Sequence, residues 1–307
     1  MEHDLGDTGQ QTRSEHDIPD DERGGLELTE SPRRIGRFSV LRRVGRGGMG
    51  DVYSALDARL GRQVAVKLLK KQPRDQKGRR SRMLREAKAM ARVTHPHVVQ
   101  VYEIGDFNGR VFITMELVEG HTLEHWQKIR VRTHQEVLDA YRQAGEGLAA
   151  AHRASVLHRD FKPGNVLIDE RGWVRVTDFG LAAWISAASS YVTAEQGIDG
   201  TFEGSDDAEP RLTRAGARLG TPAFMSPEQH LGEALDARSD QFSFCVALYE
   251  ALTGSHPFGG STRDEVRSAI LLGNVRETNH ARPLPAWLRP VLLRGLEREP
   301  ENRWPTM

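Results

Sequence analysis

At residues 158–165 the sequence reads HRDFKPGN, and this stretch decides the fold. Five side chains in it can act together in chemistry: His158, Arg159, Asp160, Lys162 and Asn165. These residue types at this spacing are expected by chance in about one chain in ten thousand. A second motif, DFG at residues 178–180, follows a strand-like run. The chain therefore carries two polar motifs in a fixed order, with Asp160 and Asp178 as their carboxylates.

The sequence before residue 120 has the pattern of a β-sheet. Apolar and polar residues alternate as in strands at residues 38–57, 61–70, 97–107 and 110–118. Asn108-Gly109 predicts a tight turn between the last two runs, and an amphipathic pattern predicts a helix over residues 78–92. Later the pattern is mostly helical, over residues 123–152 and 239–253. A β-rich segment followed by a helical one predicts an α+β fold with two lobes.

A glycine cluster, GRGGMGDV at residues 45–52, interrupts the first strand-like run. Alone it is a weak signal, because an ordinary hairpin turn would have the same residues. A dinucleotide-binding loop would need a following helix, whereas this sequence continues as a strand. The glycines could instead let backbone amides approach phosphates from a hairpin. Lys67 ends the next strand and Glu86 is on the buried side of the predicted helix, so each would offset the other's burial.

The composition excludes several classes of protein. The 307 residues include 43 basic and 43 acidic side chains, which gives no charge excess for a nucleic-acid or membrane-surface partner. Residues 1–32 hold ten acidic side chains against two arginines, so we expect residues 1–34 to form a disordered acidic tail. The single cysteine, Cys245, cannot form an intrachain disulfide. No apolar run is long enough to span a membrane and no secretory signal begins the chain, so we expect no membrane contact from this segment.

Taken together, these motifs resemble the protein kinase superfamily. The phrases GRGGMGDVY, LGTPAFMSPEQ and SDQFSFCVALYEALTGSHPF are similar to the eukaryotic-like (Hanks-type) serine/threonine kinases of bacteria. The resemblance implies a two-lobed kinase fold. An antiparallel β-sheet with one helix would form the small lobe over residues 35–118, and a mainly helical large lobe would cover residues 119–307. A long activation segment would lie over residues 178–228.

The same resemblance implies an ATP-dependent serine/threonine protein kinase, with Mg²⁺ as its metal and Mn²⁺ as an alternative. Phosphoryl transfer depends on positioning and electrostatics, and the polar residues match its known roles. Lys67, oriented by Glu86, would hold the α- and β-phosphates of ATP. Asp160 would accept the proton of the substrate hydroxyl, and Lys162 would balance charge on the γ-phosphate. Asn165 and Asp178 would bind the metal.

By resemblance, the nucleotide would lie between the glycine-rich hairpin and the large lobe. The residues expected around it are Val44, Gly45, Gly47, Gly50, Val52, Ala65, Lys67, Met115, Glu116, Val118 and Leu167. Glu116 and Val118 would offer backbone hydrogen bonds, and Met115 would close the rear of the pocket. Ordinary core packing would bury the apolar members of this set in the same way.

The resemblance also implies protein substrates and control by phosphorylation. Thr221 and Glu228 match a peptide-binding loop and its closing motif, Glu228 would pair with Arg303, and Asp240 would cap the catalytic loop. Arg159 implies that a phosphorylated residue in the activation segment switches the enzyme on, and Thr213 is the favoured site. Ser189, Ser190, Thr193 and Thr201 are further choices.

Several alternatives stay open at this level. The chain could be a kinase-shaped binding module without turnover, or a phosphotransferase for small molecules, which the segment 220–228 opposes. We expect a cytoplasmic protein, or the cytoplasmic domain of a larger and membrane-anchored one. Family members can dimerise through their small lobes, so a dimer is an open expectation here. The sequence ends four residues after Arg303, where kinases continue into a last helix, so we expect a fragment or a truncated product.

Overall fold

The computed structural model describes residues 32–70, 90, 92–179, 221–276 and 282–307. All elements below belong to one unit, Arg33–Met307. The predicted helix over residues 78–92, with Glu86 in it, falls almost wholly outside the described residues, as do the expected acidic tail and Thr213. None of the described helices is both long and apolar enough to cross a lipid bilayer.

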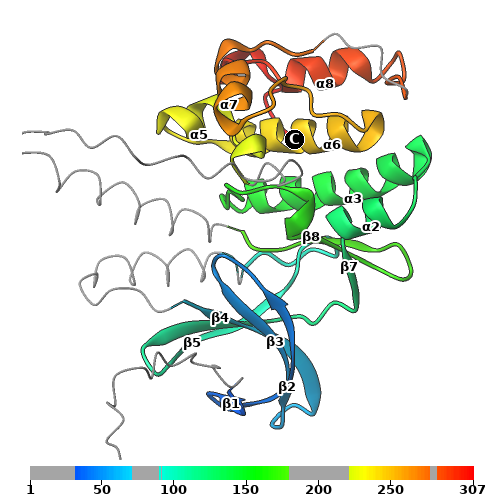
Figure 1. The fold of residues 1–307 in the computed structure, drawn as a ribbon. Helices are drawn as coiled ribbons and strands as arrows, with labels where there is room; N and C mark the ends of the chain where they lie inside the picture. The colour runs from blue at the N-terminus through cyan, green and yellow to red at the C-terminus, as the bar shows by residue number, and fades with distance from the viewer. Residues whose placement is uncertain (1–31, 71–89, 91, 180–220, 277–281) are drawn as a thin grey trace, which may run out of the picture. The chain divides into compact units, whose positions relative to one another are not determined.

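Six antiparallel strands form the larger sheet of the described chain (Figure 1). Their bounds are β1 (Arg34–Ile35), β2 (Phe38–Arg46), β3 (Gly50–Asp57), β4 (Arg62–Leu69), β5 (Val101–Phe107) and β6 (Arg110–Met115). Their order across the sheet is β1-β2-β3-β4-β6-β5. Asn108 and Gly109 join β5 to β6 with positive φ angles of 52° and 75°, as the predicted turn requires.

A second, three-stranded sheet consists of β7 (Gly120–Thr122), β8 (Val166–Asp169) and β9 (Val174–Val176), all antiparallel. Here β8 and β9 form a hairpin between HRDFKPGN and DFG. The hairpin brings the two polar motifs close together, because β8 starts directly after Asn165 and β9 ends two residues before Asp178. Val98 forms a single bridge to Val176 from outside the named strands.

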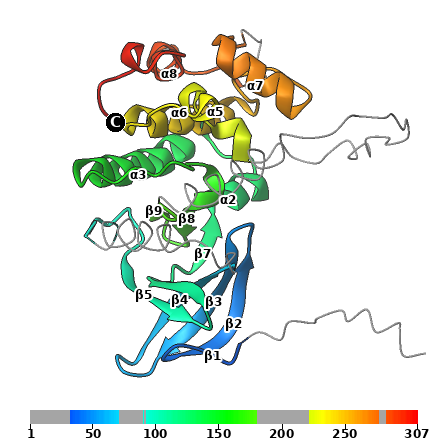
Figure 2. The same ribbon diagram turned by 90° about the vertical axis from the view of Figure 1, so that its left-hand side faces the viewer.

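Most of the regular secondary structure described after residue 122 is helical. They are α2 (Leu123–Ile129), α3 (His134–Arg153), α5 (Pro227–Leu231), α6 (Ala237–Thr253), α7 (Arg263–Leu272) and α8 (Arg289–Gly295). Short 3₁₀ turns are η1 (Pro163–Asn165), η2 (Thr221–Phe224) and η3 (Pro300–Asn302). Helices α3 and α6 lie side by side (Figure 2), and the Tyr141 hydroxyl of α3 donates to the carbonyl of Ala247 in α6 at 2.9 Å.

Three boundaries of helices and strands that we predicted from the sequence were wrong. The expected helical stretch over residues 123–152 is two helices, because Thr133 and Glu136 form a capping box that starts α3 anew. The strand expected over residues 97–107 begins only at Val101, and the one expected over 110–118 ends at Met115. The predicted α+β architecture is confirmed, with a β-rich segment followed by a helical one.

The apolar cores follow the same division. One cluster of buried side chains comes mainly from the helices, the small sheet and the loops between them, and it includes Leu148, Phe161, Phe242 and Val246. Two smaller clusters come mainly from the six-stranded sheet. The polar motifs at 158–165 and 178–179 therefore sit on a packed base that limits their motion.

Candidate active site

Two polar side chains of the HRDFKPGN stretch, Lys162 and Asn165, meet at the carboxylate of Asp160. Asp160 is buried, with 7% of its surface exposed. Its Oδ2 accepts hydrogen bonds from Lys162 Nζ at 2.7 Å and from Asn165 Nδ2 at 3.0 Å. Asn165 Nδ2 also donates to the backbone carbonyl of Asp160 at 2.8 Å. These bonds fix the orientation of the Asp160 carboxylate.

Helix α6 fixes the loop that carries Asp160 through hydrogen bonds to Asp240. Asp240 accepts hydrogen bonds from the backbone amides of His158 and Arg159, each at 2.7 Å, and His152 Nε2 lies 2.8 Å from its Oδ2. The predicted capping of this loop by Asp240 is therefore confirmed. Arg159 has a φ of 65°, a conformation that costs a non-glycine residue energy and persists only where neighbours hold it.

Gln229 of α5 contacts the strained residue Arg159 from its carbonyl side. Gln229 Nε2 donates to the carbonyl of Arg159 at 2.7 Å. The Oε1 of the same amide accepts from Ser226 N at 3.0 Å and from Ser226 Oγ at 3.2 Å. The peptide groups before and after Arg159 are thus both fixed. Our sequence analysis missed Gln229, because only the folded chain brings it to Arg159.

The His158 side chain is neutral and lies between the loop that carries Asp160 and the DFG motif. Burial lowers its pKa, although the nearby carboxylates of Asp240 and Asp160 act in the opposite direction. The neutral ring accepts from the Asp160 amide at Nδ1, 3.3 Å away, so its Nε2 donates to the Thr177 carbonyl at 2.9 Å. The ring also packs against Phe179, with centroids 4.7 Å apart. His158 therefore ties the catalytic loop to the DFG motif.

Lys67 of β4 meets the DFG motif across the site. Its Nζ lies 2.7 Å from Asp178 Oδ2, and the lysine side chain is only 7% exposed. Asp178 adopts a φ of 65°, which places it among the strained non-glycine residues. We predicted Lys67 to be paired with Glu86, which lies outside the described residues, and did not foresee the pairing with Asp178. The ion pair joins the β-rich segment to the catalytic motifs.

Asn165 and Asp178 carry ligand atoms of the kind that Mg²⁺ prefers. Both bring oxygen atoms, and the contacts of Asn165 with Asp160 use its amide nitrogen and leave the amide oxygen for a cation. Among the described residues no group of three or more His, Cys, Asp or Glu side chains could hold a metal by itself. Two protein oxygens completed by substrate phosphates and water are the usual arrangement for Mg²⁺.

Several apolar residues expected around the nucleotide pack together in the structure. Ala65 and Met115 are buried in one cluster, with Val52, Val118 and Leu167 packed against it half-buried. Behind Met115 lies a small pocket that extends to Thr177 and Asp178. Val44, also expected beside the nucleotide, is 39% exposed and lies outside this cluster.

The glycine-rich cluster is the tip of the β2–β3 hairpin. Gly47 and Gly50 exchange backbone hydrogen bonds of 2.9 and 3.3 Å, and Gly45 faces Val52 in the strand register. A Cβ on Gly50 would lie 2.2 Å from the carbonyl oxygen of Leu68, so this position admits no side chain. At the chain segment after β6, the Glu116 amide donates to the Gln100 carbonyl at 2.9 Å, and its carboxylate pairs with Arg175.

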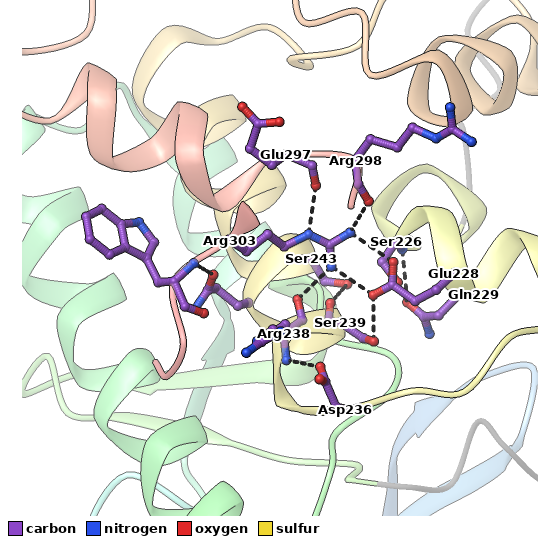
Figure 3. A network of polar contacts seen from close by, with 12 residues as sticks. Ser226, Glu228, Gln229, Asp236, Arg238, Ser239, Ser243, Glu297, Arg298 and Arg303 are labelled. Atoms are coloured by element: carbon purple, nitrogen blue, oxygen red, sulfur yellow. Dashed lines mark hydrogen bonds and ion pairs between the residues drawn. The ribbon is translucent and has the colours of Figure 1, made fainter. Parts of the chain in front are cut away.

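A buried ion pair joins α5 to the end of the described chain, at the residue before Gln229 (Figure 3). Arg303 donates through both terminal nitrogens to the two oxygens of Glu228, at 2.8 and 2.9 Å, as predicted. Its remaining donors go to the carbonyls of Arg238, Glu297 and Arg298. Burial alone would raise the pKa of Glu228, but Arg303 outweighs it and holds the pKa below 4.5. Ser239 Oγ donates to the same carboxylate at 2.7 Å.

Comparison with known proteins agrees with this geometry. The sequence profile of the protein kinase domain matches residues 38–306. The chain belongs to the protein kinase domain family. This kinase chain is 38% identical over 227 residues to the probable serine/threonine-protein kinase pknA2 of Bifidobacterium longum, a match that covers 73% of this chain and 27% of the relative.

Two further relatives match over a longer part of the kinase chain. Serine/threonine-protein kinase PknD of Mycobacterium tuberculosis is 33% identical over 274 residues, and PrkC of Bacillus subtilis is 31% identical over 273. Each match covers 88% of this chain, against 38% and 39% of the relatives. The chain thus spans about a quarter to two fifths of the length of these relatives.

Most of the residues predicted for a kinase site are brought together by the fold. Lys67 pairs with Asp178, and Lys162 and Asn165 contact Asp160. A backbone hydrogen bond of 3.0 Å from the Thr177 amide to the Asn165 carbonyl joins the two motifs. Glu86 and Thr213 lie outside the described residues. Thr221 begins η2, and its side chain is not described.

Proposed function

We propose that the chain is a serine/threonine protein kinase that transfers the γ-phosphate of ATP to Ser or Thr hydroxyls of proteins. One observation carries the proposal: a lysine and an aspartate from different parts of the chain, Lys67 and Asp178, lie 2.7 Å apart beside the loop that fixes Asp160. Membership in the kinase family and the names of the relatives support the same activity.

In this proposal Asp160 receives the proton of the substrate hydroxyl. Its two side-chain donors, Lys162 and Asn165, both contact Oδ2, so Oδ1 is the oxygen that takes the proton. The hydroxyl oxygen forms a bond to the γ-phosphorus while the bond from that phosphorus to the ADP oxygen breaks. The Lys162 ammonium group moves from Asp160 to the transferred phosphoryl group and balances its negative charge. Positioning of this kind supplies much of the rate in phosphoryl transfer.

Lys67 would bind the α- and β-phosphates, with Glu86 as the proposed partner that orients it. The glycine-rich hairpin would cover the phosphates, and Val52, Ala65, Met115, Val118 and Leu167 would hold the adenine. Asn165 and Asp178 would hold Mg²⁺, which when bound neutralises charge on the phosphates. A low exposed fraction at Lys67 keeps competing water away from its ammonium group.

The same proposal extends to the lobes of the kinase, the control of its activity and its role. Residues 35–118 would be the small lobe and residues 119–307 the large lobe, with an activation segment at 178–228. Autophosphorylation at Thr213 would place a phosphate where Arg159 can bind it and so turn the enzyme on. Signal transduction is the role that this control would serve. We propose no nucleic-acid partner, since basic and acidic side chains balance.

The test is transfer from γ-labelled ATP to peptides that differ only in a Ser, Thr or Tyr acceptor. The wild-type chain should label Ser and Thr but not Tyr. Asp160→Asn should lose nearly all transfer while still binding ATP, and Lys67→Met should lose both. ATP binding without transfer by the wild-type chain would instead favour the kinase-shaped binding module, and transfer only to small molecules would refute the protein substrate.

A further inference from the structure

A groove beside the catalytic loop has the features of a binding surface. Its volume is about 910 Å³. Lys162, Pro163 and Gly164 of the catalytic loop line it, together with Ala223 and Phe224 of η2. The remaining lining comes mainly from α2, the turn after it, α6 and the residues around α7. A protein segment that presents a hydroxyl to Asp160 would therefore extend into this groove.

The charge of the lining is unequal. Six basic side chains line the groove: Lys128, Arg130, Arg132, Lys162, Arg276 and Arg282. Only two acidic ones do so, Glu124 and Glu250. Several of the cations have carboxylate partners, Lys128 with Glu124, Arg130 and Arg132 with Glu136, and Lys162 with Asp160. Counting these outer partners as well leaves two positive charges in excess among the residues that the structure describes.

Arg276 and Arg282 are the two groove cations outside these pairs. Neither has a carboxylate partner among the residues that the structure describes. The Arg282 guanidinium donates to the carbonyl of Arg132, and the backbone of Arg276 is fixed where its amide donates to the Pro257 carbonyl at 2.8 Å. The Arg276 side chain lies across Gly259, where a Cβ would come within 2.2 Å of its Nε. Positioned guanidinium groups next to a catalytic loop favour anionic ligands.

We propose that this groove selects protein substrates that carry Asp or Glu side chains near the phosphorylated residue. The inference rests on the proposed kinase function and names its substrate class. Apolar side chains such as Val131 and Phe224 also line the groove and give the peptide backbone a surface to pack on. Arg276 and Arg282 bind the acidic side chains and so determine specificity, without touching the reacting phosphate.

The test compares three peptides with the same Thr acceptor and with flanking residues of Glu, Ala or Lys. For the wild-type chain, kcat/KM should be about tenfold higher for the Glu peptide than for the Ala peptide, and lowest for the Lys peptide. Arg276→Glu should reduce the Glu-over-Ala ratio by about three- to tenfold, mostly through KM. The preference should also weaken as ionic strength rises.

Arg171→Glu is the matched control, because it makes the same charge change at an exposed arginine in the β8–β9 turn, outside the groove lining. It should keep the wild-type peptide preference. Equal rates for all three peptides, or a preference for the Lys peptide, would overturn this inference and leave the kinase function standing. Absence of transfer to every peptide and to the chain itself would overturn the proposed function instead.

Discussion

The ion pair between Arg303 and Glu228 makes the strongest prediction about stability. Both residues are buried, 1% and 3% exposed, and all five N–H donors of Arg303 are used. Arg303→Met leaves the Glu228 carboxylate buried with Ser239 as its remaining side-chain donor. Breaking one side of such a buried pair costs about 3–5 kcal/mol of unfolding free energy. We expect a melting temperature lower by about 10 °C.

A double-mutant cycle separates the ion pair from the rest of the network. The carbonyls of Arg238, Glu297 and Arg298 lose their donor whenever Arg303 is replaced, so this loss cancels in the cycle. Glu228→Leu combined with Arg303→Met removes the uncompensated charge, and the double variant should be at least about 2 kcal/mol more stable than the sum of the single effects predicts. Urea unfolding followed by circular dichroism measures each step.

An exposed arginine pair provides the control for this cycle. Arg298 and Glu299 lie 3.3 Å apart with about half of each side chain exposed. Arg298→Ala should cost less than about 1 kcal/mol. Two results would contradict the prediction: an Arg303→Met variant that loses less than about 1 kcal/mol of unfolding free energy, or single effects that simply add. Either would show that the buried ion pair does not stabilise the fold as its geometry indicates.

Three further results are expected. Gln229→Glu keeps the acceptor for Ser226 but removes the donor to the Arg159 carbonyl, so kcat should fall about tenfold with the KM for ATP unchanged; an unchanged kcat would show that Gln229 does not position the loop. Thr213→Ala should lower kinase activity without changing the melting temperature, and a fully active variant would eliminate this phosphorylation site. The pKa of Glu228 is lower in the folded than in the unfolded chain, so its ionised form stabilises the protein above about pH 4.5 and this contribution is lost as the pH falls through the folded pKa; the stability difference between wild type and Glu228→Gln should therefore shrink below pH 4.5, and a difference that grows there would contradict the sign.

The order of elements was predictable because local patterns determine it. Alternation of apolar and polar residues predicted β2, β3 and β4, and Asn108-Gly109 predicted the β5–β6 turn. The break between α2 and α3 could also have been found, since Thr133 and Glu136 have the spacing of a capping box. Residues 97–100 look like a strand but form only an isolated bridge, because their partner is β9. Such a partner is set by the fold and leaves no periodic signal.

The candidate site also has a part that the local sequence predicts and a part that only the folded chain determines. The catalytic loop is a short local motif, so Asp160, Lys162 and Asn165 were predictable as a group. The contacts of Lys67 with Asp178 and of Gln229 with Arg159 join residues 111 and 70 positions apart. Distances of this kind follow from the packing of the two segments and cannot be obtained from spacing alone. The strained φ of Arg159 likewise becomes visible only in the folded chain.

The most direct test of the kinase account is intact-mass spectrometry of the purified chain after incubation with ATP and Mg²⁺, with Asp160→Asn in parallel. The account predicts added mass in multiples of one phosphate on the wild-type chain, located on Ser or Thr between residues 186 and 213, and none on the variant. Equal added mass on both proteins, or none on a wild-type chain that binds ATP, would contradict it.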